Sequence, residues 1–215
     1  IQIVAFASQL FVAGILSPDD VGRIKILQTW LSIFSILGSM GFSSSTLKLC
    51  SENRTKSELN AIFRSGLSFT LITTLSSYAI VLVINQFEWI SRDTAIHSLI
   101  PLAMLPLISN ALFALYVAYY QSQKEIKLIS NLTSINKIVA VFLIIIFTWF
   151  GGIKGYYIGF NLGAILLLIV VVSISRKRFR VKTNSSDKNR LYKLHWHYAR
   201  PSFFSVLLAD LASYA

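Results

Sequence analysis

Charged residues are scarce in this chain, and acidic ones are the scarcest. Of 215 residues, 20 are Lys or Arg and 9 are Asp or Glu, so 13% are charged while 54% are hydrophobic. Soluble domains carry about 25% charged residues, and half that fraction does not suit a water-facing surface. The net charge of +11 could indicate nucleic acid, but the basic residues gather in loops beside apolar runs. We therefore expect a membrane protein without a nucleic-acid partner.

Cysteine and histidine are also rare. Cys50 is the single cysteine, which excludes an internal disulfide, and no Cys/His cluster has the spacing of a zinc site. His195 and His197 flank Trp196, and we expect both at a membrane interface rather than around a metal. The sequence shows no phosphate loop, nucleophile elbow or catalytic carboxylate pair. We expect no metal, no cofactor and no enzymatic activity.

Long apolar runs take the place of these features. About 20 apolar residues cross the roughly 30 Å hydrocarbon core as a helix. By this criterion we expect spans at residues 1–16, 21–47, 61–84, 99–120, 129–149 and 156–174, and the start of a seventh at 201–215. The first run is short, so we expect it and the seventh span to be truncated.

The sequence therefore predicts an all-α, polytopic membrane protein. Its parts are a six-helix N-terminal bundle (1–175), a basic linker (176–200) and the start of a seventh transmembrane helix (201–215). Nine of the twenty Lys and Arg residues lie in the linker. The turns after the second and fourth spans belong to the same end of the bundle, and with their Lys and Arg residues the count at that end is fifteen. Only four lie at the opposite end. Because cytoplasmic loops carry the excess of Lys and Arg, we expect the linker to be cytoplasmic.

Two ionisable residues lie inside expected spans. Lys137 is about 12 Å along the fifth span, where insertion of a lysine costs roughly 2.5–3.5 kcal/mol. We interpret it as lining a cavity that opens inward, and a purely structural pairing is the alternative. Asp210, in the seventh span, could pair with Lys137 or bind a coupling cation.

A polar stripe follows one face of the second expected span. Gln28, Ser32 and Ser35 recur there at helical spacing. Small polar residues let helices pack closely in lipid, which is the interpretation we favour. The alternative is that this face lines a water-filled cavity with Arg23 and Lys25 at its mouth.

Proline and glycine mark two further features. Pro101 and Pro106 fall within the fourth span, where each frees a backbone carbonyl and predicts a kink. Gly155, Gly159 and Gly163 recur every four residues in the sixth span and predict a ridge for close contact with another helix.

Four stretches form a recognisable set. In LSPDDVGRIKILQTWLSIFSILGSMGFSSSTLKL, Leu16, Pro18 and Gly22 form an L-x-P-x-x-x-G turn, and Gly41 and Lys48 mark the exit of the helix that follows. The segment YQSQKEIKLISNLTSINKIVAVFLIIIF joins the fourth expected span to the fifth, and the sixth has a basic exit followed by Tyr198 and Pro201. In this order the stretches resemble the first loop and second helix, the passage from the fourth to the fifth helix, and the exit of the sixth helix of the polysaccharide biosynthesis membrane proteins. These are the O-antigen and capsule flippases of the multidrug/oligosaccharidyl-lipid/polysaccharide exporter superfamily, and the resemblance covers nearly the whole chain.

The resemblance implies two six-helix bundles around a central cavity that opens alternately to each side of the cytoplasmic (inner) membrane. It also implies a substrate, a polyprenyl-pyrophosphate-linked oligosaccharide, and partners among membrane lipids and possible glycan assembly proteins. A buried pyrophosphate requires cations, and the candidates are Lys137, Arg23 and Lys25. Sugar hydroxyls would suit the Gln28, Ser32 and Ser35 face and Asn161.

Three other functions remain open from the sequence. A cation-coupled multidrug exporter of the same superfamily would need acidic residues in the first bundle's membrane core, and none is visible. A membrane glycan polymerase would show a long outer loop, whereas the longest here is about residues 85–97. A membrane scaffold would not need Lys137.

Overall fold

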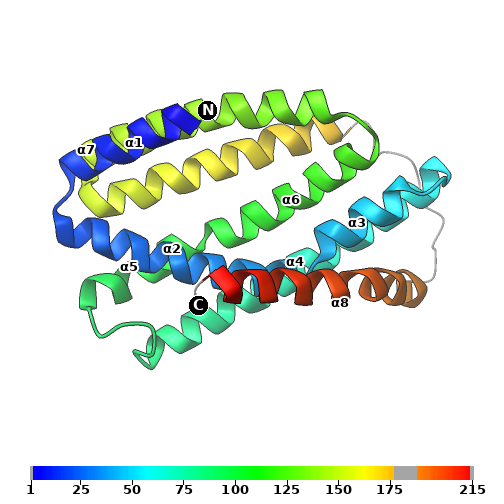
Figure 1. Cartoon of the computed structure of the whole chain (residues 1–215), viewed down its shortest axis with the longest axis horizontal. Coiled ribbons are helices and arrows are strands. Elements are labelled where there is room, and N and C mark those ends of the chain that lie inside the picture. The colour runs from blue at the N-terminus through cyan, green and yellow to red at the C-terminus, as the bar shows by residue number, and fades with distance from the viewer. Residues whose placement is uncertain (1, 177–187, 214–215) are drawn as a thin grey trace.

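The computed structural model describes residues 2–176 and 188–213, and the side chains of residues 6, 8–176 and 190–209. Within these residues the chain is helical without strands (Figure 1). The helices are α1 (Gln2–Ile15), α2 (Pro18–Ser39), α3 (Phe42–Ser51), α4 (Lys56–Gln86), α5 (Thr94–Met104), α6 (Pro106–Ser122), α7 (Ile126–Ser175) and α8 (Lys188–Ser213). The predicted all-α fold is confirmed.

Local capping residues set where several helices begin. The Ser17 hydroxyl accepts a hydrogen bond from the Asp20 backbone N–H, and Pro18 occupies the first turn of α2. Thr55 and Glu58 form a reciprocal capping box at the start of α4. Both arrangements satisfy N–H groups that a helix leaves unpaired at its start.

The second predicted span is bent rather than straight. Met40 and Gly41 adopt left-handed backbone conformations, with φ of 41° and 73°, and α2 meets α3 at 45°. Gly41 also lies against α8, because a Cβ there would be 2.5 Å from the Ala199 carbonyl oxygen. Glycine is therefore required both by the backbone angle and by the close approach of α8.

The fourth predicted span is broken by its two prolines, as expected. Pro101 cannot donate to the carbonyl four residues earlier, that of His97. The Asn85 side chain of α4 donates to this carbonyl instead, at 3.1 Å.

Pro106, at the start of α6, likewise leaves the Leu102 carbonyl without its helical donor. Asn161 of α7 donates to that oxygen at 2.9 Å. Two buried asparagines thus satisfy carbonyls freed by two prolines, which in a lipid environment would otherwise lack any donor.

The long helix α7 is a hairpin of two antiparallel halves (Figure 1). Gly152, with φ of 55° and ψ of −138°, turns the chain between them. A Cβ on Gly155 would meet the Phe147 carbonyl at 1.8 Å, and one on Gly159 would meet the Leu143 carbonyl at 2.7 Å. The predicted glycine ridge is confirmed, and it packs against the preceding half of the same hairpin.

Among the described residues, three segments are long and apolar enough to cross a membrane: Lys56–Gln86, Thr94–Ser122 and Ile126–Ser175. The bent pair α2 and α3 could form a fourth span, and α7 supplies two because it doubles back. Apolar side chains on these helices point outward, including Phe142 at 62% and Phe150 at 84% exposure. The protein is a polytopic membrane protein.

Side-chain contacts tie the turns together at the two ends of the bundle. At one end, Arg23 of α2 donates to Asp93 before α5 at 2.8 Å. At the other, Gln123 donates to the Cys50 carbonyl, and the hydroxyls of Tyr120 and Ser175 lie 2.9 Å apart. The turns therefore alternate between ends as the charge pattern predicted.

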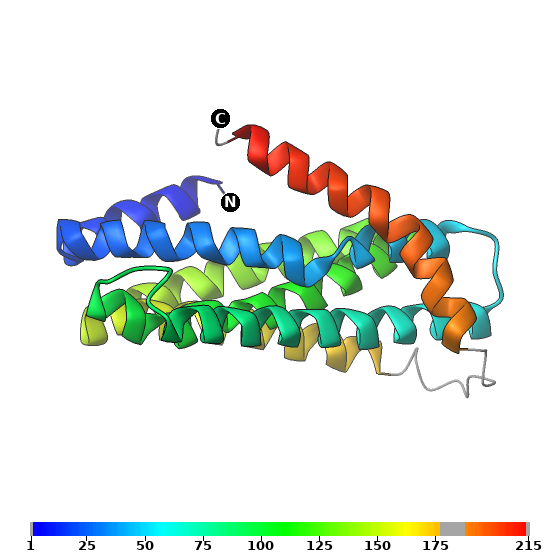
Figure 2. The same cartoon turned by 90° about the horizontal axis from the view of Figure 1, so that it is seen from below.

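The basic segment contains more helix than expected. Residues 177–187 lie outside the described part of the chain, but α8 begins at Lys188, well before the predicted seventh span. Figure 2 shows the start of α8 crossing the bundle at α3 and α4, with its C-terminal half on the side where the N-terminus lies. Residues 188–200, predicted as linker, are therefore the first half of a packed helix.

Candidate functional site

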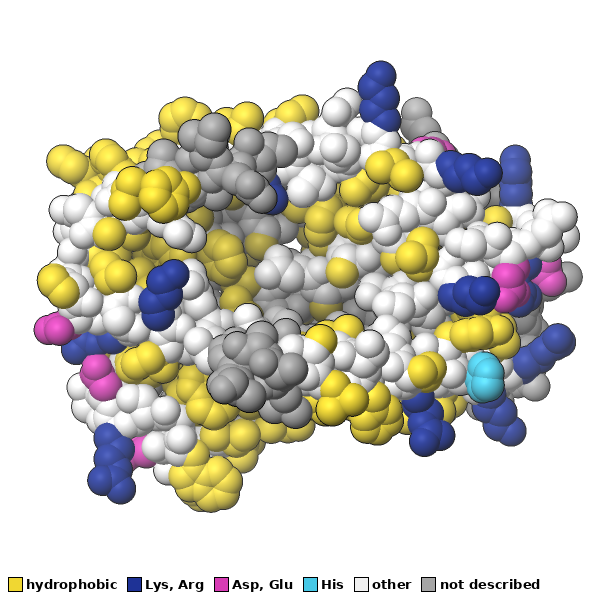
Figure 3. Space-filling model, in the orientation of Figure 1, with side chains coloured by type: hydrophobic (Ala, Val, Ile, Leu, Met, Phe, Trp, Pro, Cys, Tyr) yellow, Lys and Arg dark blue, Asp and Glu magenta, His cyan; other side chains and the backbone are white. Residues whose placement is uncertain are grey.

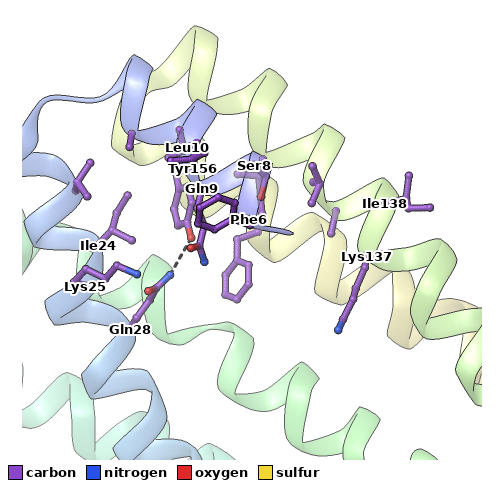
Figure 4. A pocket seen from close by; sticks show the side chains of 17 residues that line it. Phe6, Ser8, Gln9, Leu10, Ile24, Lys25, Gln28, Lys137, Ile138 and Tyr156 are labelled. Carbon is purple, nitrogen blue, oxygen red and sulfur yellow. Dashed lines mark hydrogen bonds between the residues drawn. The ribbon is translucent and has the colours of Figure 1, made fainter. Parts of the chain in front are cut away.

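A cavity of about 490 Å³ opens between α1, α2 and α7. Three predicted site residues line it: Lys25, Gln28 and Lys137 (Figure 4). Most of the remaining lining is apolar and comprises Phe6, Leu10, Val12, Ala13, Val21, Ile24, Ile138, Ala140, Val141, Ile144 and Phe160. The cavity thus combines a largely apolar wall with two cationic groups.

Lys25 and Lys137 approach the cavity from opposite sides. Lys25 extends from α2, and Lys137 extends from the first half of α7, roughly 16 Å from its start (Figure 4). Neither ammonium group has a hydrogen bond or an ion pair with any residue that the structure describes. Both are therefore available to an anion.

A hydrogen bond between α2 and α7 forms part of the cavity wall. The Gln28 amide donates to the Tyr156 hydroxyl at 3.0 Å, as Figure 4 shows. From the sequence we expect Tyr156 at the outer interface, as part of an aromatic belt. It lines the cavity, and no pattern in the sequence links it to Gln28, 128 residues away.

Arg23 is not among the residues that line this cavity. It forms ion pairs with Asp20 and Asp93, at 2.9 and 2.8 Å. These bonds fasten the start of α2 to the cap of α5. The bond from Arg23 and the Ala95 backbone N–H, together with Arg23's charge, hold the pKa of Asp93 below its usual value. In this structure Arg23 therefore has a structural role, and its position at the mouth of a cavity stays a prediction.

The other predicted residues lie elsewhere. Asn161 is buried, and its amide donates to the carbonyls of Leu102 and Tyr157. Ser32 is exposed and Ser35 half-buried on α2, and neither lines the cavity. Asp210 belongs to α8, but its side chain lies outside the described residues, as does its suggested pairing with Lys137.

Sequence reasoning missed a buried polar cluster at the start of α8. His195, expected at the interface, is fully buried between α3 and α4. One ring nitrogen, Nδ1, lies 3.0 Å from the Ser45 hydroxyl, and Nε2 lies 3.0 Å from the Ile62 carbonyl and 3.1 Å from the Ser65 hydroxyl. With Gly41 against Ala199, this cluster fixes α8 on the bundle.

Residues 1–215 match the family described as "Polysaccharide biosynthesis protein". The chain belongs to this family. No curated protein matches the chain. The polysaccharide biosynthesis family is thus established by a match over the whole sequence, in agreement with the resemblance seen in its motifs.

Among solved structures, this member of the polysaccharide biosynthesis family is similar to the one titled "Crystal structure of MATE in complex with Br-NRF". The TM-score is 0.70 at 14% sequence identity, so the similarity concerns the fold. It covers 99% of this chain and 51% of the other. The chain therefore spans about half the length of a MATE protein.

Proposed function

We propose that this chain is the first bundle of a flippase that moves a polyprenyl-pyrophosphate-linked oligosaccharide across the cytoplasmic membrane by alternating access. The observation that carries the proposal is a pair of lysines without a partner in the described part of the chain, Lys25 and Lys137, on opposite sides of one largely apolar cavity. A pyrophosphate that leaves water needs cationic partners, because an uncompensated charge is costly in a low-dielectric site. An anion bound between the two lysines would contact α2 and α7 together.

The apolar wall of the cavity fits the same substrate. A prenyl chain attached to the pyrophosphate would lie against side chains such as Phe6, Ile138 and Phe160. Polar groups at the edge, the Gln28 amide and the Tyr156 hydroxyl, could bond sugar hydroxyls. The function is then transport rather than covalent chemistry, with the basic end of the bundle in the cytoplasm.

A cation-coupled multidrug exporter is the second candidate, because the fold is that of a MATE protein. A cationic drug would need a carboxylate in its site. The described lining of the cavity holds two lysines and no Asp or Glu, which favours an anionic substrate.

The test is complementation of a strain that lacks the full-length protein, with surface polysaccharide as the readout. Replacing Lys137 with Ala, or Lys25 with Ala, removes one charged contact to the phosphates, worth about 1.5–3 kcal/mol. We expect surface polysaccharide to fall at least about tenfold, and the double variant to lose it. Lys137→Arg keeps the charge and should retain most of the activity.

Lys154→Ala is the matched control, since Lys154 is exposed at the turn of the α7 hairpin and outside the cavity lining. Membrane levels of each variant are measured by immunoblot. Normal polysaccharide in the Lys25→Ala/Lys137→Ala variant at wild-type protein level would contradict the proposed function.

A further inference from the structure

Helix α8 packs on the bundle through one face and presents its opposite face outward. His195 and Ala199 are fully buried, whereas Lys193, His197 and Arg200 are exposed. At 100° per residue, these three basic side chains lie on the side of the helix opposite the buried pair.

This outward face carries a shallow, open groove. It is lined by Lys193, Trp196, His197, Arg200, Pro201 and Phe204. All six residues belong to α8, which contains Pro201 within its length. The lining is cationic at the N-terminal end and apolar at the C-terminal end.

The charged groups in this groove have no partner among the residues that the structure describes. Among the residues that the structure describes, neither Lys193 nor Arg200 forms an ion pair or hydrogen bond through its side chain. Most Lys and Arg side chains visible in Figure 3 gather at the end of the molecule formed by α3 and the start of α8. An anion at this groove would therefore meet two cations that are not engaged by any ion pair among the described residues.

The same face continues as an apolar stripe. Phe204 is 53% exposed and Leu208 is 65% exposed, and they lie about 6 and 12 Å beyond Arg200 along the axis. Lys193, His197, Arg200, Phe204 and Leu208 follow one line of the helix at intervals of three and four residues. Along this side of α8, basic side chains are therefore followed by exposed apolar side chains.

We propose that this face of α8 is a binding site for an anionic glycerophospholipid, with the phosphate between Lys193 and Arg200 and an acyl chain along Phe204 and Leu208. The order of side chains along the helix, basic and then apolar, matches such a lipid. Its anionic headgroup lies at the membrane interface and its acyl chains enter the hydrocarbon. The His197 ring adds a hydrogen-bond donor beside the phosphate. This site is separate from the Lys25–Lys137 cavity and does not depend on transport.

The experiment measures lipid binding to the full-length protein, purified in an uncharged detergent. Phosphatidylglycerol is titrated, with phosphatidylcholine as the zwitterionic comparison, and binding is followed by native mass spectrometry and by the thermal unfolding midpoint. Each cation near a lipid surface contributes about a fivefold gain in affinity. The Lys193→Ala/Arg200→Ala variant should therefore bind phosphatidylglycerol about 25-fold more weakly than wild type, with phosphatidylcholine binding unchanged.

The matched control is Lys48→Ala/Lys127→Ala, which removes the same charge from exposed positions at the same end of the molecule. It should bind phosphatidylglycerol like wild type. A second variant, Phe204→Ser, retains both cations. It should weaken the binding of phosphatidylglycerol while leaving any binding of soluble glycerol phosphate unchanged.

Three results would overturn the proposal. An equal loss of phosphatidylglycerol affinity in the Lys48→Ala/Lys127→Ala control would show that the whole basic end attracts the lipid without a defined site. Equal binding of glycerol phosphate and phosphatidylglycerol by wild type would show a site for soluble phosphate. Absence of any preference for phosphatidylglycerol in the full-length protein would show that other parts of the protein cover this face.

Discussion

The bond from Asn161 to the Leu102 carbonyl allows a sharp test of how the broken fourth span is stabilised. Asn161→Leu keeps the side-chain volume and removes the donor. The Tyr157 carbonyl would keep its helical N–H partner, but the Leu102 carbonyl, freed by Pro106, would have none. A buried polar group left unpaired costs about 1–3 kcal/mol, and we expect the free energy of unfolding to fall by that amount.

A double-mutant cycle separates this role from general packing. Pro106→Ala restores a backbone N–H that can donate to the Leu102 carbonyl as α5 continues into α6. In the Pro106→Ala background, Asn161→Leu should therefore cost at least about 1 kcal/mol less than in wild type.

The assay is equilibrium unfolding of the purified full-length protein in mixed detergent micelles, with Asn131→Leu as the control. Asn131 is exposed on the first half of the same α7 hairpin, and its replacement should change stability by less than about 0.5 kcal/mol. Equal costs of Asn161→Leu in both backgrounds would refute the idea that this side chain replaces the donor lost at Pro106.

Three further predictions concern stability in lipid-free detergent. Gly159→Ala places a Cβ 2.7 Å from backbone in the other half of α7 and should cost about 1–3 kcal/mol of unfolding free energy, whereas Gly22→Ala, with open space around it, should be neutral or stabilising. His195→Ala should cost about 1–3 kcal/mol and speed hydrogen exchange in α8, while His197→Ala on the exposed face of the same helix should do neither. The pKa of Asp93 is lowered in the folded protein, so its ion pair with Arg23 stabilises the fold above about pH 4 and this stabilisation is lost as the pH falls below about 4. Between pH 7 and pH 3, the thermal unfolding midpoint should therefore fall less in Asp93→Asn than in wild type. Identical pH profiles for the two proteins would contradict a stabilising role of the ion pair.

The fold was largely predictable because its determinants are local. The spans follow from hydropathy, the start of α2 from Ser17 and Pro18, and the hairpin contact from the spacing of Gly155, Gly159 and Gly163. The alternation of turns also followed, since it requires only that consecutive spans run antiparallel.

The site was predictable only in part. Lys137 was indicated by its position, a charge where lipid disfavours it, and Lys25 and Gln28 by their shared helix face. The roles of Asn161 and His195 depend on partners from other helices, brought together by a proline break and by the packing of α8. Such pairings have no periodicity in the sequence.

The directions of aromatic side chains were also not predictable from the sequence. Because Tyr116, Tyr119 and Tyr120 lie near the end of a span, the sequence predicts that they belong to a belt of aromatic side chains at the membrane interface. All three are buried, with Tyr116 and Tyr119 packed against Phe63. Trp89 and Trp149 are 75% and 66% exposed, so their side chains point outward. Position along a span is readable from the sequence, whereas the direction in which an aromatic side chain points depends on the neighbouring helices.

The tight hairpin of α7 has a consequence for how the chain enters the bilayer during synthesis. Its two halves contact each other through residues close in sequence, such as Leu143 and Gly159, and local contacts form early. Lys137 makes the first half a poor candidate to insert alone, at a cost of roughly 2.5–3.5 kcal/mol. The second half carries no charge from Gly155 to Ser175, so insertion as a pair lets an uncharged partner carry the lysine into the membrane.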